Sequence, residues 1–193
     1  DHVMNTTKQI LIYNAMNHPL PVFAHVPMVL GHDRTRLSKR HGATSVTAYR
    51  DMGLLPEAFI NFLARLGWSY GDQEFFKRAE LIEKFTLDRV GKSAGIFDPV
   101  KLNALNGDHI QAATPQALAR HLLPFLHAQG LAADDDPYLQ GVIATLQARS
   151  KTLQEMALQA HFYYTEPIVL DEQAAKKFLK AEVLEPLKHL RTQ

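Results

Sequence analysis

The most informative segment of the sequence is a basic loop between two glycines, Gly31-His32-Asp33-Arg34-Thr35-Arg36-Leu37-Ser38-Lys39-Arg40-His41-Gly42. Just before this loop, residues 22–30 form an apolar, β-branched run that predicts a buried strand broken by Pro27. The glycines at both ends let the loop backbone bend and approach a ligand, and its lysine and arginines suit phosphate oxygens. A strand followed by such a loop indicates phosphate binding; by composition alone, a solvated basic surface is the alternative.

The second half of the loop carries a more specific pattern. Residues 36–42 read Arg-Leu-Ser-Lys-Arg-His-Gly, which closely resembles the second ATP signature of class I aminoacyl-tRNA synthetases. In the glutamate enzymes of that family the signature commonly reads Lys-Leu-Ser-Lys-Arg-His-Gly, so Arg36 replaces the first lysine and Lys39 matches the second. The resemblance continues through residues 1–10 and 21–25 before the loop and residues 43–50 after it. The chain is identified on these residues as similar to the bacterial-type glutamate enzymes.

The resemblance implies a mainly α fold. It comprises the end of a Rossmann-type α/β catalytic fold, then a stem-contact helical region, then the start of an all-helical anticodon-binding domain. We expect these parts at residues 1–40, 41–112 and 113–193, the last truncated. The chain does not begin with methionine and has no leader-like segment, so we expect a fragment of a longer protein.

Composition bounds the class of protein. The 193 residues are 46% hydrophobic and 21% charged, which is ordinary for one large or two small globular domains. No segment approaches the run of about eighteen apolar residues that a membrane helix needs. The chain has no cysteine, which excludes disulfides and thiolate zinc sites and fits a reducing compartment. We expect a cytoplasmic monomer with no membrane contact.

Local signals place the helices. Asn5-Thr6-Thr7 is a candidate cap for a first helix ending near residue 17, and Ser45 for a short one closed by Gly53. Proline near a helix start, often after a capping residue, predicts further helices. The expected starts are Leu55-Pro56, Asp98-Pro99, Thr114-Pro115, Asp136-Pro137 and Thr152, with two short helices at 171–179 and 183–190. Trp68 and Tyr70 are interpreted as core residues in preference to base-stacking platforms.

The basic loop carries the predicted chemistry. In the class I reaction the substrate carboxylate attacks the α-phosphate of ATP, and the aminoacyl group then passes to the 3′ end of tRNA. Positioned cations stabilise the charge on the phosphates without a covalent step. Lys39 is therefore the predicted catalytic residue. The predicted ATP-binding residues are Arg36, Leu37, Ser38, Lys39 and Arg40, with Mg²⁺ accompanying the phosphates and no protein ligand for the metal.

Three residues are weaker candidates for contact with tRNA. Lys92 lies in a small-residue connection that the family places against the tRNA, and the alternative is a plain turn. Arg149 and Lys151 lie in a turn that resembles the anticodon approach of the bacterial-type enzymes. For Arg149 the alternative is a charge that neutralises a helix end. The run Asp134–Asp136 is interpreted as a helix start and not as a metal site, because consecutive side chains do not converge.

The function implied by the resemblance is that of a glutamate–tRNA ligase, with tRNA(Glu), ATP and L-glutamate as partners. The family's first ATP signature, His-any-Gly-His, is absent, as are the residues expected to grip glutamate, so we expect this chain alone to be inactive. Two alternatives stay open: a non-catalytic tRNA-binding module, and a related ligase that charges another substrate. Helical character after residue 113 argues against the glutamine enzymes, whose distal part is mainly β-barrel.

Overall fold

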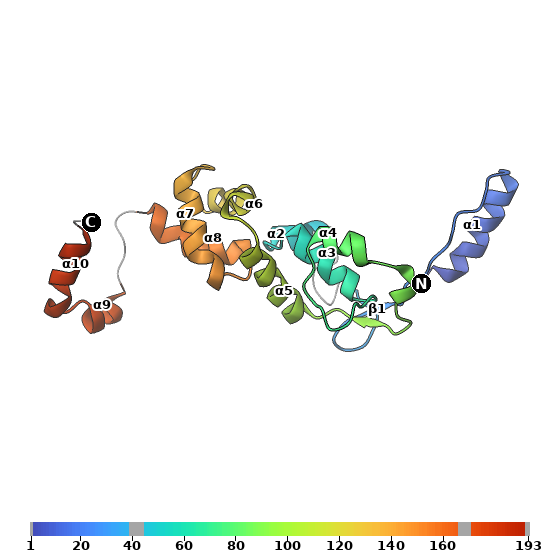
Figure 1. The fold of residues 1–193 in the computed structure, drawn as a ribbon, viewed down its shortest axis with the longest axis horizontal. Helices are drawn as coiled ribbons and strands as arrows, with labels where there is room; N and C mark the ends of the chain where they lie inside the picture. The colour runs from blue at the N-terminus through green and yellow to red at the C-terminus, as the bar shows by residue number, and fades with distance from the viewer. Residues whose placement is uncertain (1, 39–44, 166–170, 192–193) are drawn as a thin grey trace.

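The computed structural model describes residues 2–38, 45–165 and 171–191, which form an elongated chain of helices (Figure 1). The α-helices are α1 (Val3–Ala15), α2 (Val46–Asp51), α3 (Pro56–Arg65), α4 (Arg78–Lys84), α5 (Pro99–Ala112), α6 (Pro115–Ala128), α7 (Pro137–Leu146), α8 (Leu153–Tyr164), α9 (Glu172–Phe178) and α10 (Leu184–Arg191). Short 3₁₀ helices are η2 (Leu87–Arg89), η3 (Gln147–Arg149) and η4 (Ala181–Val183). The described strands are β1 (Val29–Leu30) and β2 (Gly95–Ile96), which pair in parallel. The predicted mainly α fold is confirmed.

The helix starts follow the capping residues that the sequence offers. The Asp98 carboxylate accepts hydrogen bonds from the Val100 and Lys101 backbone nitrogens. Side chains at the same position of later helices accept from backbone nitrogens in the same way, namely those of Thr114, Asp136, Thr152 and Asp171. Each such bond satisfies a donor that the first helical turn leaves unpaired, worth about 1 kcal/mol. The predicted helices after residue 45 are present in the described part of the chain.

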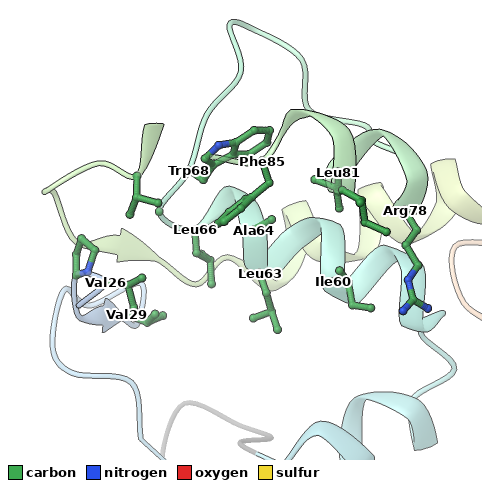
Figure 2. A pocket seen from close by; sticks show the side chains of 14 residues that line it. Val26, Val29, Ile60, Leu63, Ala64, Leu66, Trp68, Arg78, Leu81 and Phe85 are labelled. Atoms are coloured by element: carbon green, nitrogen blue, oxygen red, sulfur yellow. The ribbon is translucent and has the colours of Figure 1, made fainter. Parts of the chain in front are cut away.

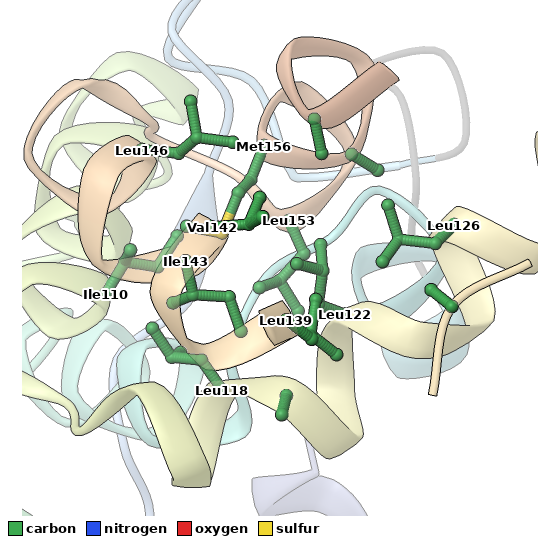
Figure 3. Packing of buried hydrophobic residues seen from close by; sticks show 14 of the residues in the cluster. Ile110, Leu118, Leu122, Leu126, Leu139, Val142, Ile143, Leu146, Leu153 and Met156 are labelled. Atoms are coloured by element: carbon green, nitrogen blue, oxygen red, sulfur yellow. The ribbon is translucent and has the colours of Figure 1, made fainter. Parts of the chain in front are cut away.

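A compact core holds the C-terminal half together. Helices α6, α7 and α8 pack against one another around fully buried aliphatic side chains (Figure 3). The cluster reaches back across the α5–α6 connection, because Leu55, Ala58 of α3 and Ile110 of α5 belong to it. The labelled members in Figure 3 include Leu118, Leu122, Leu126, Leu139, Ile143, Leu146 and Met156. The distal helices are thus fixed to α3 and α5 through shared apolar packing.

Two smaller clusters organise the part before α6. In one, Leu54, Phe62, Phe97 and Leu102 are buried together between α3, β2 and α5. In the other, Trp68 and Phe76 pack with Leu81 of α4, and Trp68 is only 2% exposed. The interpretation of Trp68 as a core residue is confirmed.

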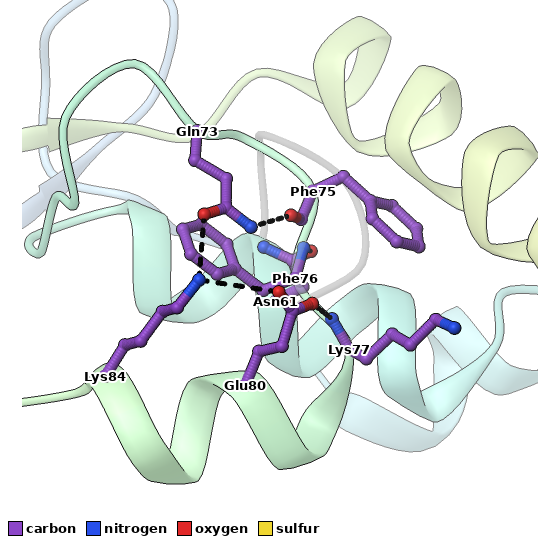
Figure 4. A network of polar contacts seen from close by, with 7 residues as sticks. All are labelled: Asn61, Gln73, Phe75, Phe76, Lys77, Glu80 and Lys84. Carbon is purple, nitrogen blue, oxygen red and sulfur yellow. Dashed lines mark hydrogen bonds and ion pairs between the residues drawn. The ribbon is translucent and has the colours of Figure 1, made fainter.

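A buried asparagine fastens the loop before α4. The Asn61 Nδ2 donates to the Glu74 carbonyl oxygen (3.0 Å), and its Oδ1 accepts from the Phe76 nitrogen (2.8 Å) and contacts the His109 Nε2 (3.1 Å). Around Asn61, further half-buried hydrogen bonds connect Gln73 to the Phe75 carbonyl oxygen and Lys84 to Gln73 and Glu80 (Figure 4). The loop is therefore held to α3 by polar contacts within the N-terminal half.

The predicted buried strand over residues 22–30 is wrong. Only Val29–Leu30 forms a strand, and the side chains of Val22 and Val26 are 93% and 71% exposed. Pro21 and Pro27 have no backbone N–H, and β1 has a single neighbour among the described strands, two residues long. An apolar, β-branched pattern needs adjacent strands to become a buried strand, and the described part of the chain supplies one short partner.

The first helix is present but begins earlier than predicted. It starts at Val3 after His2, and not at the candidate cap Asn5-Thr6-Thr7. The Thr6 hydroxyl is used elsewhere, because it bonds the His2 carbonyl oxygen (3.3 Å) and the His25 Nε2 (3.0 Å). None of the helices in the described residues combines the length and apolarity that a membrane crossing requires.

Candidate nucleotide and tRNA site

A tight hairpin positions the start of the basic loop. The Gly31 nitrogen donates to the Thr35 carbonyl oxygen (2.8 Å), and the Arg34 nitrogen to the Gly31 carbonyl oxygen (2.9 Å). The Asp33 Oδ1 accepts from the backbone nitrogen and the hydroxyl of Thr35 at 3.0 and 2.9 Å. Arg34 takes the left-handed conformation, with φ 59°, that such a turn requires. The turn brings Arg36 beside Leu30 in an antiparallel bridge.

Two neighbouring residues at the end of the hairpin have different surroundings. Leu37 is half-buried, packs against the Leu54–Phe62 cluster, and its nitrogen donates to the Val29 carbonyl oxygen (3.0 Å). Arg36, one residue earlier, is exposed. The fold therefore holds the backbone at residues 36–38 on the core through Leu37 and leaves Arg36 exposed. Of the predicted ATP-binding residues, Arg36, Leu37 and Ser38 lie in this segment; Lys39 and Arg40 lie outside the described residues.

A cavity of about 530 Å³ lies between this segment and α1. Arg36 and Leu37 line it together with Thr6 and Gln9 of α1 and with His2, which precedes that helix. Residues 23–29 complete the wall. The bond between the Thr6 hydroxyl and the His25 Nε2 joins the two sides. Sequence reasoning did not assign His2, Thr6 or His25 to the site. The sequence did hold one indication of their role, because residues 1–10 and 21–25 carry the family resemblance.

Lys92 lines a neighbouring cavity that shares residues 24–27 with the first. A cavity of about 410 Å³ is lined by Lys92, Gly91 and Leu87 and by residues 24–27, so His25 borders both cavities. Lys92 is exposed. The structure thus places one of the three tRNA candidates against residues 24–27, which also line the cavity beside Arg36.

A third cavity, of about 660 Å³, is apolar (Figure 2). Val26, Pro27 and Val29, residues 66–68, Phe85 and Val90 line it together with residues of α3 and α4, and Arg78 is the one charged residue among them. Several of these apolar side chains are open to solvent, including Val26, Ile60, Leu63 and Ile82. Its lining suits contact with apolar groups and does not suit phosphate.

Arg149 and Lys151 lie away from the hairpin, beyond α5. They occupy the end of η3 and the turn before α8, and η3 contacts α5 and α7. Both side chains are exposed. The Lys151 backbone is held at both ends, because its nitrogen donates to the Glu155 Oε2 (2.8 Å) and its carbonyl oxygen accepts from the Asn106 Nδ2 (2.6 Å). Arg36 and Lys92 thus line two different cavities that share residues 24–27, whereas Arg149 and Lys151 lie at a second location.

Metal-binding side chains do not converge in the part of the chain described. No group of three His, Asp or Glu side chains there is arranged to hold an ion. Of the run Asp134–Asp136, the last residue caps α7 by accepting from the Leu139 nitrogen (2.8 Å). That run is a helix start, as predicted.

A family model described as tRNA synthetases class I (E and Q), catalytic domain, matches residues 1–104, and one described as an anticodon binding domain matches residues 117–193. The chain belongs to the class I tRNA synthetase family for glutamate and glutamine.

Individual relatives agree with this assignment. The chain is 59% identical over 190 residues to a glutamate–tRNA ligase of Desulfosudis oleivorans, covering 98% of this chain and 41% of that protein. It is 58% identical over 179 residues to the Geobacter sulfurreducens ligase, covering 93% of this chain and 38% of that protein. The solved glutamate tRNA ligase of Elizabethkingia meningosepticum matches with a TM-score of 0.72 at 27% identity, covering 98% of this chain and 41% of that one. The chain spans about two fifths of the length of these relatives.

Proposed function

We propose that this chain is part of a glutamate–tRNA ligase, which activates glutamate with ATP and transfers it to the 3′ end of tRNA(Glu). The observation that carries the proposal is the signature loop itself. Its first residues are held in a hairpin on the core, and Arg36 borders a cavity that His2 and His25 also line. In a chain of this family, that cavity is the candidate site for the ATP phosphates.

The proposed chemistry is electrostatic. Negative charge grows on the phosphates as the substrate carboxylate attacks and pyrophosphate leaves. Lys39 follows the anchored segment directly, so its ammonium is proposed to stabilise that charge, with Arg36 and Arg40 attracting the nucleotide and Ser38 bonding within the loop. Mg²⁺ is proposed to arrive with the phosphates, because no three carboxylate or imidazole groups converge among the described residues.

The remaining partners follow from the same proposal. L-glutamate binds mostly through residues beyond this chain, and the protein acts as a cytoplasmic monomer. Residues 1–40 contribute the end of the catalytic fold, residues 41–112 contact the tRNA stem, and residues 113–193 begin the anticodon-binding domain. The helices α6, α7 and α8 favour a glutamate enzyme over a glutamine enzyme, whose distal part is mainly β-barrel. Comparing the charging of tRNA(Glu) and tRNA(Gln) decides between them.

Replacing Lys39 with alanine in the whole ligase tests the catalytic proposal. Loss of one preorganised charge donor lowers the rate of aminoacylation about 10²- to 10³-fold. A matched control is Lys176→Ala, which removes the same charge from an exposed position on α9. Pyrophosphate exchange at saturating tRNA measures both variants. Undiminished exchange in the Lys39 variant would remove this residue from the mechanism.

A further inference from the structure

The buried amide of Asn106 joins three segments that are far apart in the sequence. Asn106 lies on α5 and is fully buried. Its Oδ1 accepts from the Leu55 nitrogen (2.8 Å), and its Nδ2 donates to the carbonyl oxygens of Lys151 (2.6 Å) and Gly53 (3.5 Å). A buried amide with both ends paired is retained at little cost, whereas loss of one partner leaves a buried polar atom unsatisfied. The turn before α8 is thus attached to the middle of α5.

The same turn has a second attachment to α5, four residues earlier. The Gln147 Nε2 donates to the carbonyl oxygens of Ile110 (2.7 Å) and Ala113 (2.7 Å) at the end of that helix. Between the two attachments lies Arg149, whose side chain is exposed. Ser150 is buried and its hydroxyl donates to the Leu146 carbonyl oxygen (3.0 Å). The backbone on both sides of Arg149 is therefore fixed while its guanidinium projects into solvent.

The other end of α5 is connected to the signature hairpin. Strand β2 pairs with β1, and the Phe97 nitrogen donates to the Leu30 carbonyl oxygen (2.8 Å) immediately before Asp98 caps the helix. Helix α5 has 14 residues, which is a length of about 21 Å. One rigid helix therefore carries the start of the ATP loop at its beginning and the Arg149 turn at its end.

We infer that Asn106 is a positioning residue for tRNA recognition. It attaches the Arg149 turn to α5 and so sets the position of that turn relative to the ATP loop. This role rests on the proposed function and adds to it a residue that touches neither ATP nor RNA. Its effect is on how well tRNA is held and not on the chemical step, because the hairpin end of α5 has its own attachments.

The variant Asn106→Asp in the whole ligase tests this role. It keeps the acceptor for the Leu55 N–H but places an oxygen against the Lys151 carbonyl, which detaches the turn. The KM for tRNA(Glu) transcript is expected to rise about tenfold, equivalent to about 1.4 kcal/mol, while kcat at saturating tRNA and the KM for ATP stay unchanged. The matched control is Asn61→Asp, because Asn61 is equally buried and its Nδ2 also donates to a backbone carbonyl, but within the N-terminal half. The control lowers the melting temperature and leaves the KM for tRNA unchanged.

Three results would overturn the role of Asn106: an unchanged KM for tRNA in a folded Asn106→Asp protein, an equal rise in the Asn61→Asp control, or a full tenfold rise when Asn106→Asp is added to Arg149→Ala. A small further rise in that double variant supports action through Arg149. If Asn106→Asp does not fold, the half-buried Gln147→Glu tests the second attachment with the same expectation. Charging of tRNA(Glu) by the unmodified ligase is measured first: its absence refutes the proposed function, and intact charging with an unchanged KM in the variant refutes only this inference.

Discussion

Replacing Gly53 with alanine probes the contact between the turn before α3 and the start of α8. Gly53 has a φ of +85°, and an added Cβ would lie 2.6 Å from the Gln154 nitrogen and 2.9 Å from the Leu153 nitrogen. Both atoms belong to the backbone. The Leu153 nitrogen also donates to the Gly53 carbonyl oxygen (2.9 Å), so separating the two segments breaks that bond. The alanine therefore meets both conformational strain and a steric clash.

The two costs can be estimated separately. Left-handed backbone costs an L-residue about 1–2 kcal/mol relative to glycine. Forcing a methyl group into a packed contact, with backbone shifts, costs about 1–3 kcal/mol. Gly53→Ala is therefore expected to lower the free energy of unfolding by about 2–5 kcal/mol. Gly130→Ala is a matched control, because Gly130 has a φ of +75° and no atom lies within 4 Å of its added Cβ.

Urea unfolding of the 193-residue chain, followed by circular dichroism, measures the difference between the two variants. We expect Gly53→Ala to lose about 1–3 kcal/mol more than Gly130→Ala. Hydrogen exchange should also show faster opening of the backbone amides near residues 151–154. Equal losses in the two variants would refute the clash, and would mean that the α3 and α8 turns move apart without cost.

The remaining predictions concern Arg149 and His109. Arg149→Ala in the whole ligase is expected to flatten discrimination among tRNAs with altered anticodons by about 1–3 kcal/mol, with little change in melting temperature. A fall in melting temperature with intact discrimination would instead identify Arg149 as a helix-end charge. Burial lowers the pKa of His109 from its ordinary 6.5, against the opposing carboxylates of Glu57 and Asp108. The unfolded chain therefore binds a proton at His109 more tightly than the folded chain does. The buried neutral imidazole stabilises the fold fully above about pH 6.5, and this stability is lost as the pH falls below that value. His109→Gln should make urea unfolding less sensitive to pH between about 7.5 and 5.5, and an unchanged pH dependence would contradict the assignment.

Local chemistry made most of the helices predictable. Asp98, Thr114, Asp136 and Thr152 each precede a helix and each accepts a bond from a backbone nitrogen inside it. These signals lie within a few residues of the element they start, and so they can be read from the sequence. The start of the first helix could not be predicted in this way. The Thr6 hydroxyl bonds His25, nineteen residues away, and does not cap the helix.

The parts that sequence reasoning missed depend on distant partners. The apolar run over residues 22–30 has the composition of a buried strand, but whether it is buried depends on neighbouring strands. The buried amides of Asn61 and Asn106 were not predicted, because asparagine usually occupies turns and caps, and their partners lie up to 53 residues away. The one available signal was their placement inside helices, where asparagine is a poor helix former.

The distribution of apolar side chains explains why the site could be predicted only in part. Around α6, α7 and α8 most apolar side chains are buried in one core, although Leu158 and Phe162 on α8 are 63% and 50% exposed. Toward both ends of the chain no such core covers them: Leu11 on α1 is 64% exposed, Val22 is 93% exposed, and Phe178 on α9 is 62% exposed. The described residues leave these three apolar side chains largely uncovered. The cavity beside Arg36 is walled by α1 and residues 23–29, so the candidate nucleotide site lies beside two of these uncovered segments. The Arg149 turn, in contrast, is attached to α5 and bordered by the core of α6, α7 and α8, and its position follows from residues within this chain.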